Sequence, residues 1–463
     1  MAKNVNMNMT QGPLLGKIIR FSVPLMLSGM LQLLYNAADV VVVGRFAGSA
    51  ALAAVGSTGA LVNLLVNLFM GVSVGCNVLV ARYYGARDYK SVSETVHCAM
   101  GASLIIGLMA GAVGLIFSTP LLRLMGSPED VLPLASLYLR IYFCGMPFNI
   151  AYNFGAAVLR AVGDTKRPLY ILSAAGIVNV VLNLFLVIVF HMGVAGVAVA
   201  TVTSQIISAL LVVRVLRLRE DCCHLNVKEI RIYKDKMIGM IKVGLPAGIQ
   251  GSLFSLSNVI IQSSVNSFGS VVVAGNAAAA NLEGFVYIAM NAIYQASITF
   301  ISQNLGAQKP KRILRVLWIC IGLVFAVGVV LGNLMFLFGD KLLAIYCSDS
   351  EGLQAEMIAV GLTRMKYLAI PYFLSGLMEI GCGGMRGLGR SWLPTSVSLM
   401  GACGVRVVWI FTIFQQFGTL NSLYVSYPIS WAATFTAHMI CFFLVFRKIR
   451  ASMPEETDEL LPA

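Results

Sequence analysis

Residues 159–168 read LRAVGDTKRP and residues 385–394 read MRGLGRSWLP, with an arginine, a glycine and a proline at the same three places. Each copy ends one long apolar stretch and begins the next. Further pairs follow in the same order, at offsets of roughly 221 to 226 residues: Pro24 and Pro246, Gly85 and Gly306, Arg140–Pro147 and Arg364–Pro371. A repeat of this length predicts an internal duplication. Duplicated apolar halves are typical of secondary transporters.

The composition is that of a membrane protein. Of the 463 residues 58% are hydrophobic and 11% are charged, so a water-soluble chain would have to expose much apolar surface. Stretches of about 20 or more apolar residues are long enough to cross a bilayer. They contain scattered Gly, Ala and Ser, as packed helices do, and lack the alternation of a β-barrel. Twelve such stretches occur, near 16–43, 51–80, 93–118, 132–159, 168–190, 194–216, 237–266, 276–303, 313–338, 357–386, 394–416 and 420–446. The sequence therefore predicts an all-α integral membrane protein with twelve transmembrane helices in two pseudo-symmetric halves.

Lysine and arginine are concentrated in alternate loops, and this distribution predicts the orientation in the membrane. If the amino terminus is cytoplasmic, the basic loops at 82–90, 166–167 and 309–315 and the long loop between the halves all lie on the cytoplasmic side. We therefore expect a multi-pass protein of the cell (inner, cytoplasmic) membrane with both termini in the cytoplasm. The predicted parts are an N-terminal lobe (1–219), a cytoplasmic linker (220–236) and a C-terminal lobe (237–463) with a short cytoplasmic tail.

The charge and the motifs exclude several classes of function. The net charge of +13 is an orientation signal and a contact with anionic lipid headgroups, since no basic stretch is joined to a nucleic-acid-binding module. The sequence contains no phosphate-binding loop and no nucleophile elbow, and its four histidines are too far apart to suggest a metal site. We expect no enzyme activity, no cofactor and no nucleic-acid partner. An ion gradient, of H⁺ or Na⁺, remains as the energy source for transport.

Ionisable residues within the apolar stretches are the candidate functional residues, because a charge in a bilayer is costly and normally faces a cavity or a partner. In the first half Asp39 lies near the outer end of the first stretch. Asn36 lies close by, and Tyr35 lies one helical turn earlier on the same face as Asp39. The alternative interpretation is that Asp39 is an ordinary polar group at the end of a helix.

Neutral side chains on other stretches could complete a site around Asp39. Asn179 and Asn183 lie four residues apart on the fifth stretch, Asn153 lies on the fourth and Thr201 on the sixth. A carboxylate surrounded by such oxygens can take up H⁺ or hold Na⁺. The asparagines could instead only join helices, and both interpretations stay open.

The second half carries a different polar set, which consists of Glu283, Glu379 and Arg406. The register of the repeat places Glu379 opposite Asn153 and Arg406 close to the counterpart of Asn179. We therefore expect a Glu379–Arg406 pair, reached by Glu283, that lines a cavity. A locked, purely structural pair is the alternative.

Four motifs together resemble those of the multidrug and toxic compound extrusion (MATE) family. They are YNAADVVVVGRFAG (35–48), ARYYGA (81–86), SQNLGA (302–307) and LRAVGDTKRP with its echo MRGLGR. The likeness covers nearly the whole chain and is greatest to the bacterial MepA-like branch. It implies two six-helix lobes around a V-shaped central cleft, and export of cationic amphiphiles in exchange for H⁺ or Na⁺.

The resemblance also implies roles for individual residues. The ion-coupling roles of the family fall on Tyr35, Asp39, Asn179, Asn183 and Thr201. Asp39 would then be the residue that binds Na⁺, if Na⁺ is the coupling ion. The chain departs from the family's pattern at two points, and the first of them leaves the coupling ion open. Asn183 stands where some relatives have a second aspartate, and the seventh stretch lacks a glutamate of other branches, for which Glu283 is the candidate replacement.

The expected function is secondary active efflux of drug-like cations by a monomer. The alternative is a flippase for a lipid-linked or other anionic amphiphile, whose cleft should be basic. Arg140, Arg364, Lys366 and Arg406 support this alternative, although Arg140 and Arg364 are expected to snorkel to the outer interface. A channel or a membrane enzyme has no supporting motif in the sequence.

Overall fold

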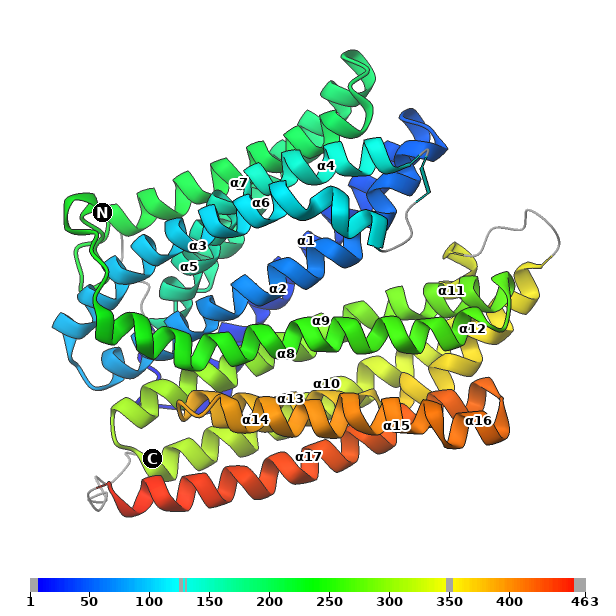
Figure 1. The fold of residues 1–463 in the computed structure, drawn as a ribbon. Helices are drawn as coiled ribbons and strands as arrows, with labels where there is room; N and C mark the ends of the chain where they lie inside the picture. The colour runs from blue at the N-terminus through cyan, green and yellow to red at the C-terminus, as the bar shows by residue number, and fades with distance from the viewer. Residues whose placement is uncertain (1–6, 125–127, 130, 347–352, 454–463) are drawn as a thin grey trace. The chain divides into compact units, whose positions relative to one another are not determined.

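A computed structural model describes residues 7–124, 128–129, 131–346 and 353–453, and the regular structure within these ranges is helical (Figure 1). Eleven helical segments of the described chain are long and apolar enough to cross a membrane. The predicted span at 132–159 adds one more. It consists of α4 (Leu132–Cys144) and α5 (Met146–Ala161), which are interrupted at Gly145. The prediction of an all-α membrane protein with twelve spans is confirmed.

The chain divides into two compact units. The first consists of Met1–Asn8 and Val23–Ser252, and the second of Met9–Ser22 and Leu253–Ala463. Helix α1 (Leu14–Phe46) therefore contributes its first residues to the second unit and the rest to the first. Helix α8 (Lys234–Asn266) likewise contributes to both. The predicted boundaries at residues 219 and 237 remain predictions.

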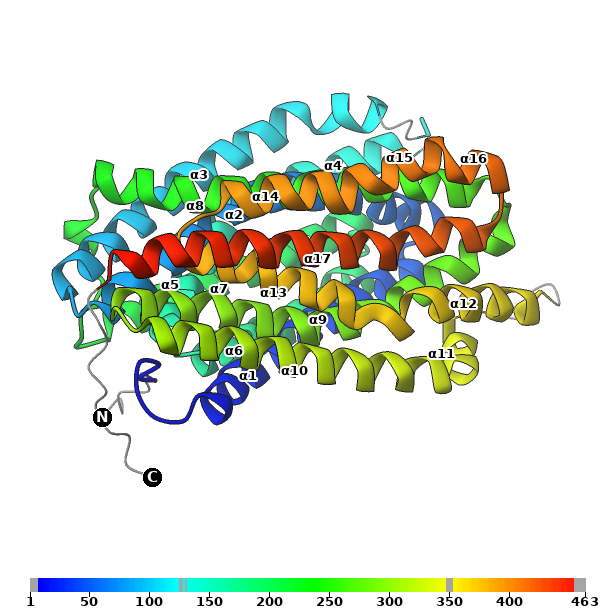
Figure 2. The ribbon, with the colours of Figure 1, turned by 90° about the horizontal axis from the view of Figure 1, so that it is seen from below.

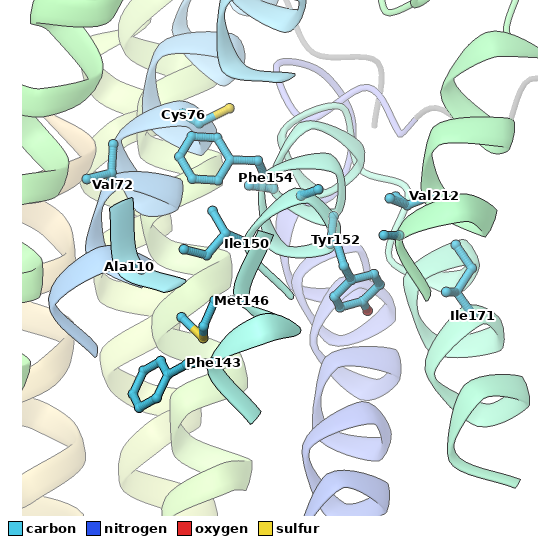
Figure 3. Packing of buried hydrophobic residues seen from close by; sticks show 14 of the residues in the cluster. Val72, Cys76, Ala110, Phe143, Met146, Ile150, Tyr152, Phe154, Ile171 and Val212 are labelled. Carbon is cyan, nitrogen blue, oxygen red and sulfur yellow. The ribbon is translucent and has the colours of Figure 1, made fainter. Parts of the chain in front are cut away.

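In the first unit α5 is the central helix, in contact with α2, α3 and α7. Met146, Ile150 and Phe154 of α5 and Phe143 of α4 are fully buried in this unit, among side chains such as Cys76 of α2 (Figure 3). This central position explains why most residues of α5 are buried. The other helical elements of the unit are α2 (Ser49–Gly85), α3 (Tyr89–Leu124), α6 (Lys166–Leu184) with the π-helical turn Phe185–Val189, α7 (Gly193–Arg217) and the turn Val227–Glu229.

In the second unit α13 has the corresponding position, in contact with α9, α10 and α17. Figure 2 shows α17 running alongside α13. The helices of this unit are α9 (Ser270–Gly306), α10 (Pro310–Leu337), α11 (Gly339–Tyr346), α12 (Gln354–Leu368), α13 (Phe373–Gly387), α14 (Trp392–Ser398), α15 (Val405–Phe411), α16 (Ile413–Phe417) and α17 (Leu420–Ala451). The turn Ile370–Tyr372 separates α12 from α13, and a π-helical turn, Leu399–Gly404, separates α14 from α15.

The duplication is visible in the backbone. The contacts that join α2, α3 and α5 in the first unit recur between α9, α10 and α13 in the second. Residues with positive φ also occur in matching pairs, which are Gly48 (88°) and Gly269 (97°), Arg87 (59°) and Gln308 (56°), and Gly163 (89°) and Gly389 (78°). The left-handed conformation is uncommon for non-glycine residues, so its recurrence at Arg87 and Gln308 is strong evidence that the two loops share an origin.

Buried contacts of Asp164 hold the turn within LRAVGDTKRP in the first unit. Asp164 is fully buried in the turn before α6, and its Oδ1 accepts a hydrogen bond from the backbone N–H of Arg167 at 3.2 Å. Its other oxygen lies 3.6 Å from the guanidinium of Arg219, which also binds Asp221 through two nitrogens. Burial raises the pKa of Asp164, and the two arginines oppose that shift. Through Asp164 and Arg219, the turn between α5 and α6 therefore contacts the segment that follows α7.

Four glycines allow α2 and α8 to cross at short distance within the first unit. A Cβ atom on Gly75 would lie 2.0 Å from the carbonyl oxygen of Met240, and one on Gly248 would lie 2.2 Å from that of Leu68. Gly71 and Gly244 meet backbone atoms of the other helix in the same way. Each helix thus carries two glycines four residues apart, a spacing that is typical of close helix contacts in membranes.

We expect Gly248→Leu to destabilise the protein severely, because the atoms that it would meet are backbone and cannot move aside. The free energy of unfolding should fall by about 3 kcal/mol or more, at or above the upper end of ordinary overpacking. Thermal unfolding of the purified protein in detergent measures this effect. Gly322→Leu in α10 is the matched control, since nothing lies within 4 Å of a Cβ there. Equal melting temperatures for the two variants would contradict the prediction.

Candidate functional site

The centre of the candidate site in the first unit is the contact between Asp39 of α1 and Asn183 of α6. The Nδ2 group of Asn183 donates a hydrogen bond to Oδ1 of Asp39. Asn183 is fully buried and Asp39 is half-buried. The contact joins residues 144 positions apart in the sequence. No Lys, Arg or His of the described chain forms an ion pair with Asp39, and an acid within a membrane span normally faces a cavity or a partner.

Tyr35 lies one helical turn before Asp39 and also contacts α6. Its hydroxyl donates a hydrogen bond to the carbonyl oxygen of Ser173 at 3.3 Å. A Cβ atom on Gly176 would lie only 1.8 Å from the Tyr35 ring, so the ring occupies space that only a glycine leaves free. The two residues of α1 therefore contact α6 at points about two to three helical turns apart.

Two amide oxygens on the same face of α6 have no hydrogen-bond partner among the described residues. They are Oδ1 of Asn179 and Oδ1 of Asn183, both buried. A buried carbonyl oxygen without a partner is costly unless something binds it. Within the described chain no group of three or more His, Cys, Asp or Glu side chains could hold a metal ion. The contact with Asn183 places the carboxylate of Asp39 beside one of these amides.

The other predicted residues of this set have partners within their own helices or lie at the surface. The hydroxyl of Thr201 donates to the carbonyl oxygen of Val197 at 3.0 Å. Nδ2 of Asn153 donates to the carbonyl oxygen of Asn149 at 2.8 Å. Asn36 is exposed. Within the described chain no hydrogen bond or ion pair joins any of the three to Asp39, so their predicted roles gain no geometric support.

One residue near Asp39 was missed by the sequence reasoning. Tyr138 of α4 lies within electrostatic range of Asp39. Its ring stacks on that of Tyr142, with centroids 6.2 Å apart and planes inclined by 18°. The two tyrosines are four residues apart in an apolar helix, and this spacing was the available signal.

The predicted Glu379–Arg406 pair in the second unit is wrong. No ion pair joins these two side chains in the part of the chain that the structure describes. Nε of Arg406 donates to Oγ of Ser430 on α17 at 2.9 Å, whereas the cation within electrostatic range of Glu379 is Arg386. The reason is that α15, which carries Arg406, packs on α17. The register of a repeat gives the depth of a residue and does not give the direction in which its side chain points.

Glu283 instead pairs with Arg364, and the expectation that Arg364 snorkels to the outer interface is also wrong. Arg364 is 8% exposed and binds both oxygens of Glu283, through Nε at 2.9 Å and Nη2 at 2.7 Å. Its Nη1 donates to Oδ1 of Asn276 at 2.8 Å, and the hydroxyl of Tyr424 donates to the same oxygen at 3.0 Å. The network joins α9, α12 and α17. Arg140, by contrast, is exposed.

We expect Gly176→Ala to displace Tyr35 while leaving the fold intact, because the added Cβ meets the far end of a side chain that can rotate away. Loss of one hydrogen bond of about 1 kcal/mol corresponds to roughly a fivefold decrease in any equilibrium that depends on it. A decrease of that size in the initial rate of substrate efflux, at an unchanged melting temperature, is the expected result. Gly59→Ala, at a position with nothing within 4 Å, is the control. Equal rates in both variants would remove Tyr35 from the site.

Comparisons with known proteins agree with the fold and with the motifs. The family model described as MatE matches residues 24–185 and 246–412, one match in each half. "Probable multidrug resistance protein YoeA" of Bacillus subtilis is 30% identical over 424 residues, which cover 89% of this chain and 90% of the relative. "Multidrug export protein MepA" of Staphylococcus aureus is 22% identical over 456 residues, 97% of each chain.

Solved structures show the same fold. A multidrug resistance MATE family transporter of the MOP superfamily in an outward-facing conformation has a TM-score of 0.87 at 20% identity, over 98% of this chain and 100% of that chain. A MOP superfamily transporter from Pyrococcus furiosus, described as having a binding pocket of reverse polarity, has a TM-score of 0.90 at 20% identity, over 97% and 100%. With two family matches that together cover more than half of its length, this chain belongs to the MatE family of multidrug and toxic compound extrusion transporters.

Proposed function

We propose that this MATE transporter exports drug-like cationic amphiphiles in exchange for H⁺ or Na⁺, by alternating access, with Asp39 as the residue that carries the ion. The observation that carries the proposal is the contact of Asp39 with Asn183 beside the two unpartnered amide oxygens of α6. Asn183 serves the ionised carboxylate by donating Nδ2–H. When the carboxyl group takes up H⁺, its O–H needs an acceptor, and the oxygens of Asn179 and Asn183 can supply one.

The same oxygens supply ligands if the coupling ion is Na⁺. One Asp39 oxygen together with the amide oxygens of Asn179 and Asn183 gives a partial shell of hard ligands, which water or substrate would complete. In both cases binding of the ion neutralises the carboxylate of Asp39, which then no longer attracts a cationic substrate. A site that binds the coupling ion and the substrate in turn has a different affinity for the substrate with and without the ion. Exchange transport requires such a difference.

The proposed orientation has both termini in the cytoplasm, and the proposed working unit is a monomer. The distribution of lysine and arginine among the loops supports the orientation. The names of the relatives, multidrug resistance protein and multidrug export protein, support drug-like cargo.

The flippase alternative loses most of its basis in this structure. Arg364 is neutralised by Glu283, and Arg140 and Lys366 are exposed. Arg406 is the residue of that set that stays buried without an acid partner in the described chain. Efflux of cations is therefore the function that the geometry supports best.

Transport by the purified protein in liposomes tests the proposal. Vesicles loaded with ethidium receive either a pH gradient without Na⁺ or a Na⁺ gradient without a pH difference. We expect one of the two gradients to drive ethidium movement, and an ionophore that collapses the gradient should stop it. Protein-free vesicles are the control. Movement at the control rate under both gradients would overturn the proposal.

A further inference from the structure

The feature that the transport proposal leaves unused is the buried cation Arg406 on α15. Its side chain is 5% exposed, and Nε donates to Oγ of Ser430 at 2.9 Å. Its Nη2 group is buried and has no hydrogen-bond partner among the described residues. A buried charge that lacks both a counter-charge and part of its hydrogen bonds is strongly unfavourable unless a ligand supplies them.

Aromatic rings fix the guanidinium in one orientation. The Arg406 Cζ atom lies 4.2 Å from the ring centroid of Tyr427 and 5.5 Å from that of Trp431. The two rings meet edge to face, with centroids 5.7 Å apart, and Tyr372 meets Trp431 in the same way at 5.5 Å. Stacking on ring faces uses the flat side of a guanidinium and leaves its N–H edge free for a planar acceptor. A preorganised edge of this kind loses little entropy when it binds an oxyanion.

The acids nearest to this region are committed elsewhere. Both oxygens of Glu283 bind Arg364. Glu379 lies within electrostatic range of Arg386, not of Arg406. The positive charge of Arg406 therefore has no counter-charge within the described part of this unit.

The helix that carries Arg406 is also irregular at this point. The π-helical turn Leu399–Gly404 ends directly before Val405, and both this turn and α15 pack on α17. A π turn inserts one extra residue and so rotates the side chains that follow it, and such turns are frequent at functional sites. Here the turn directs Arg406 toward Ser430 and Tyr427 of α17.

We infer that Arg406 is the anchor for a single carboxylate or phosphate group on an amphiphilic molecule, with its unpartnered Nη2 group as the donor. The inference rests on the proposed transport function and adds a substrate class to it, namely compounds that carry an anionic group besides their apolar or cationic body. Two sources share this chemistry, an exported drug-like acid or zwitterion and an anionic lipid headgroup.

A pair of dyes that differ in one group tests the inference. The full-length protein, in nanodiscs of phosphatidylcholine, is titrated with a rhodamine that carries a free carboxylate and with the methyl ester of the same dye, by fluorescence polarisation. We expect the wild-type protein to bind the acid about tenfold more tightly than the ester, the worth of one charge-assisted hydrogen bond. In Arg406→Gln the acid should lose this advantage while the ester binds as before. Arg390→Gln, which removes an exposed arginine, should leave both affinities unchanged.

Several results would overturn the inference. Equal binding of acid and ester by the wild-type protein would do so without any variant, so a misfolded Arg406→Gln cannot hide the answer. A full preference for the acid in a folded Arg406→Gln protein would do so as well. Arg406→Lys keeps the charge and loses the planar edge, so we expect it to retain only part of the preference.

Further measurements distinguish a transported acid from a lipid headgroup as the occupant. They also distinguish failure of this inference from failure of the transport proposal. If a lipid headgroup is the occupant, nanodiscs rich in phosphatidylglycerol should abolish the preference for the acid dye. If a transported acid is the occupant, the preference should persist there. If the transport proposal fails, the ester dye binds normally but neither the pH gradient nor the Na⁺ gradient moves it. If this inference fails, the ester dye is bound and transported, and the acid dye binds no more tightly than the ester.

Discussion

The variant Asp39→Asn is expected to reduce gradient-driven ethidium movement to the rate of protein-free vesicles. The substitution keeps the size of the side chain, and its amide can still form a hydrogen bond with Asn183. It cannot release H⁺ and has no charge with which to hold Na⁺, so ion and substrate no longer compete for one group. The same liposome assay, with the pH gradient and the Na⁺ gradient applied separately, measures the effect.

Two controls make this result specific to Asp39. Asp340→Asn makes the same chemical change at an exposed position of α11 and should leave transport unchanged. The melting temperature of Asp39→Asn should stay close to that of the wild-type protein, since no buried partner is lost. Gradient-driven movement at the wild-type rate in Asp39→Asn would remove the carboxylate from the coupling mechanism.

The second large effect is expected from the buried pair in the second unit. Glu283→Gln should lower the free energy of unfolding by about 3–5 kcal/mol, because it leaves the charge of Arg364 buried and unpaired. Arg364→Met should cost a similar amount, since it leaves Glu283 in the same condition. Thermal or chemical unfolding of the detergent-solubilised protein measures both.

The double variant Glu283→Gln/Arg364→Met distinguishes a true pair from two independent losses. If the charges depend on each other, the double variant should be clearly more stable than the sum of the single effects predicts. Lys366→Met, at an exposed position of the same helix, is the control and should change stability little. Strictly additive losses would contradict the assigned pairing.

The architecture was predictable from the sequence because it depends on properties that are local in the chain. Runs of about 20 apolar residues specify the spans, and the repeated motifs specify the two halves. The Tyr35–Asp39 and Asn179–Asn183 spacings place each pair on one face of its helix, which is also a local property. The contact between Asp39 and Asn183 joins two helices, and its geometry came from the structure.

The partners in the second unit were not predictable for the opposite reason. The sequence predicted that Arg364 lies at the outer interface, because an apolar stretch does not show which other helices pack against it. It is buried because α12 packs against both α9 and α17, which bring Glu283 and Tyr424 to it. The partner of Arg406 depends likewise on the packing of α15, and a π-helical turn precedes this helix without a clear signature in the sequence.

The matched left-handed residues bear on the ancestry of the protein. At Arg87 and Gln308 the side chains have diverged completely, yet both copies keep the same unusual backbone conformation. The shared conformation indicates that the two loops descend from one ancestral turn. The path of the main chain in these turns is the same in the two halves, whereas their buried charges differ, with Asp39 in the first half and Arg406 beside the Glu283–Arg364 pair in the second.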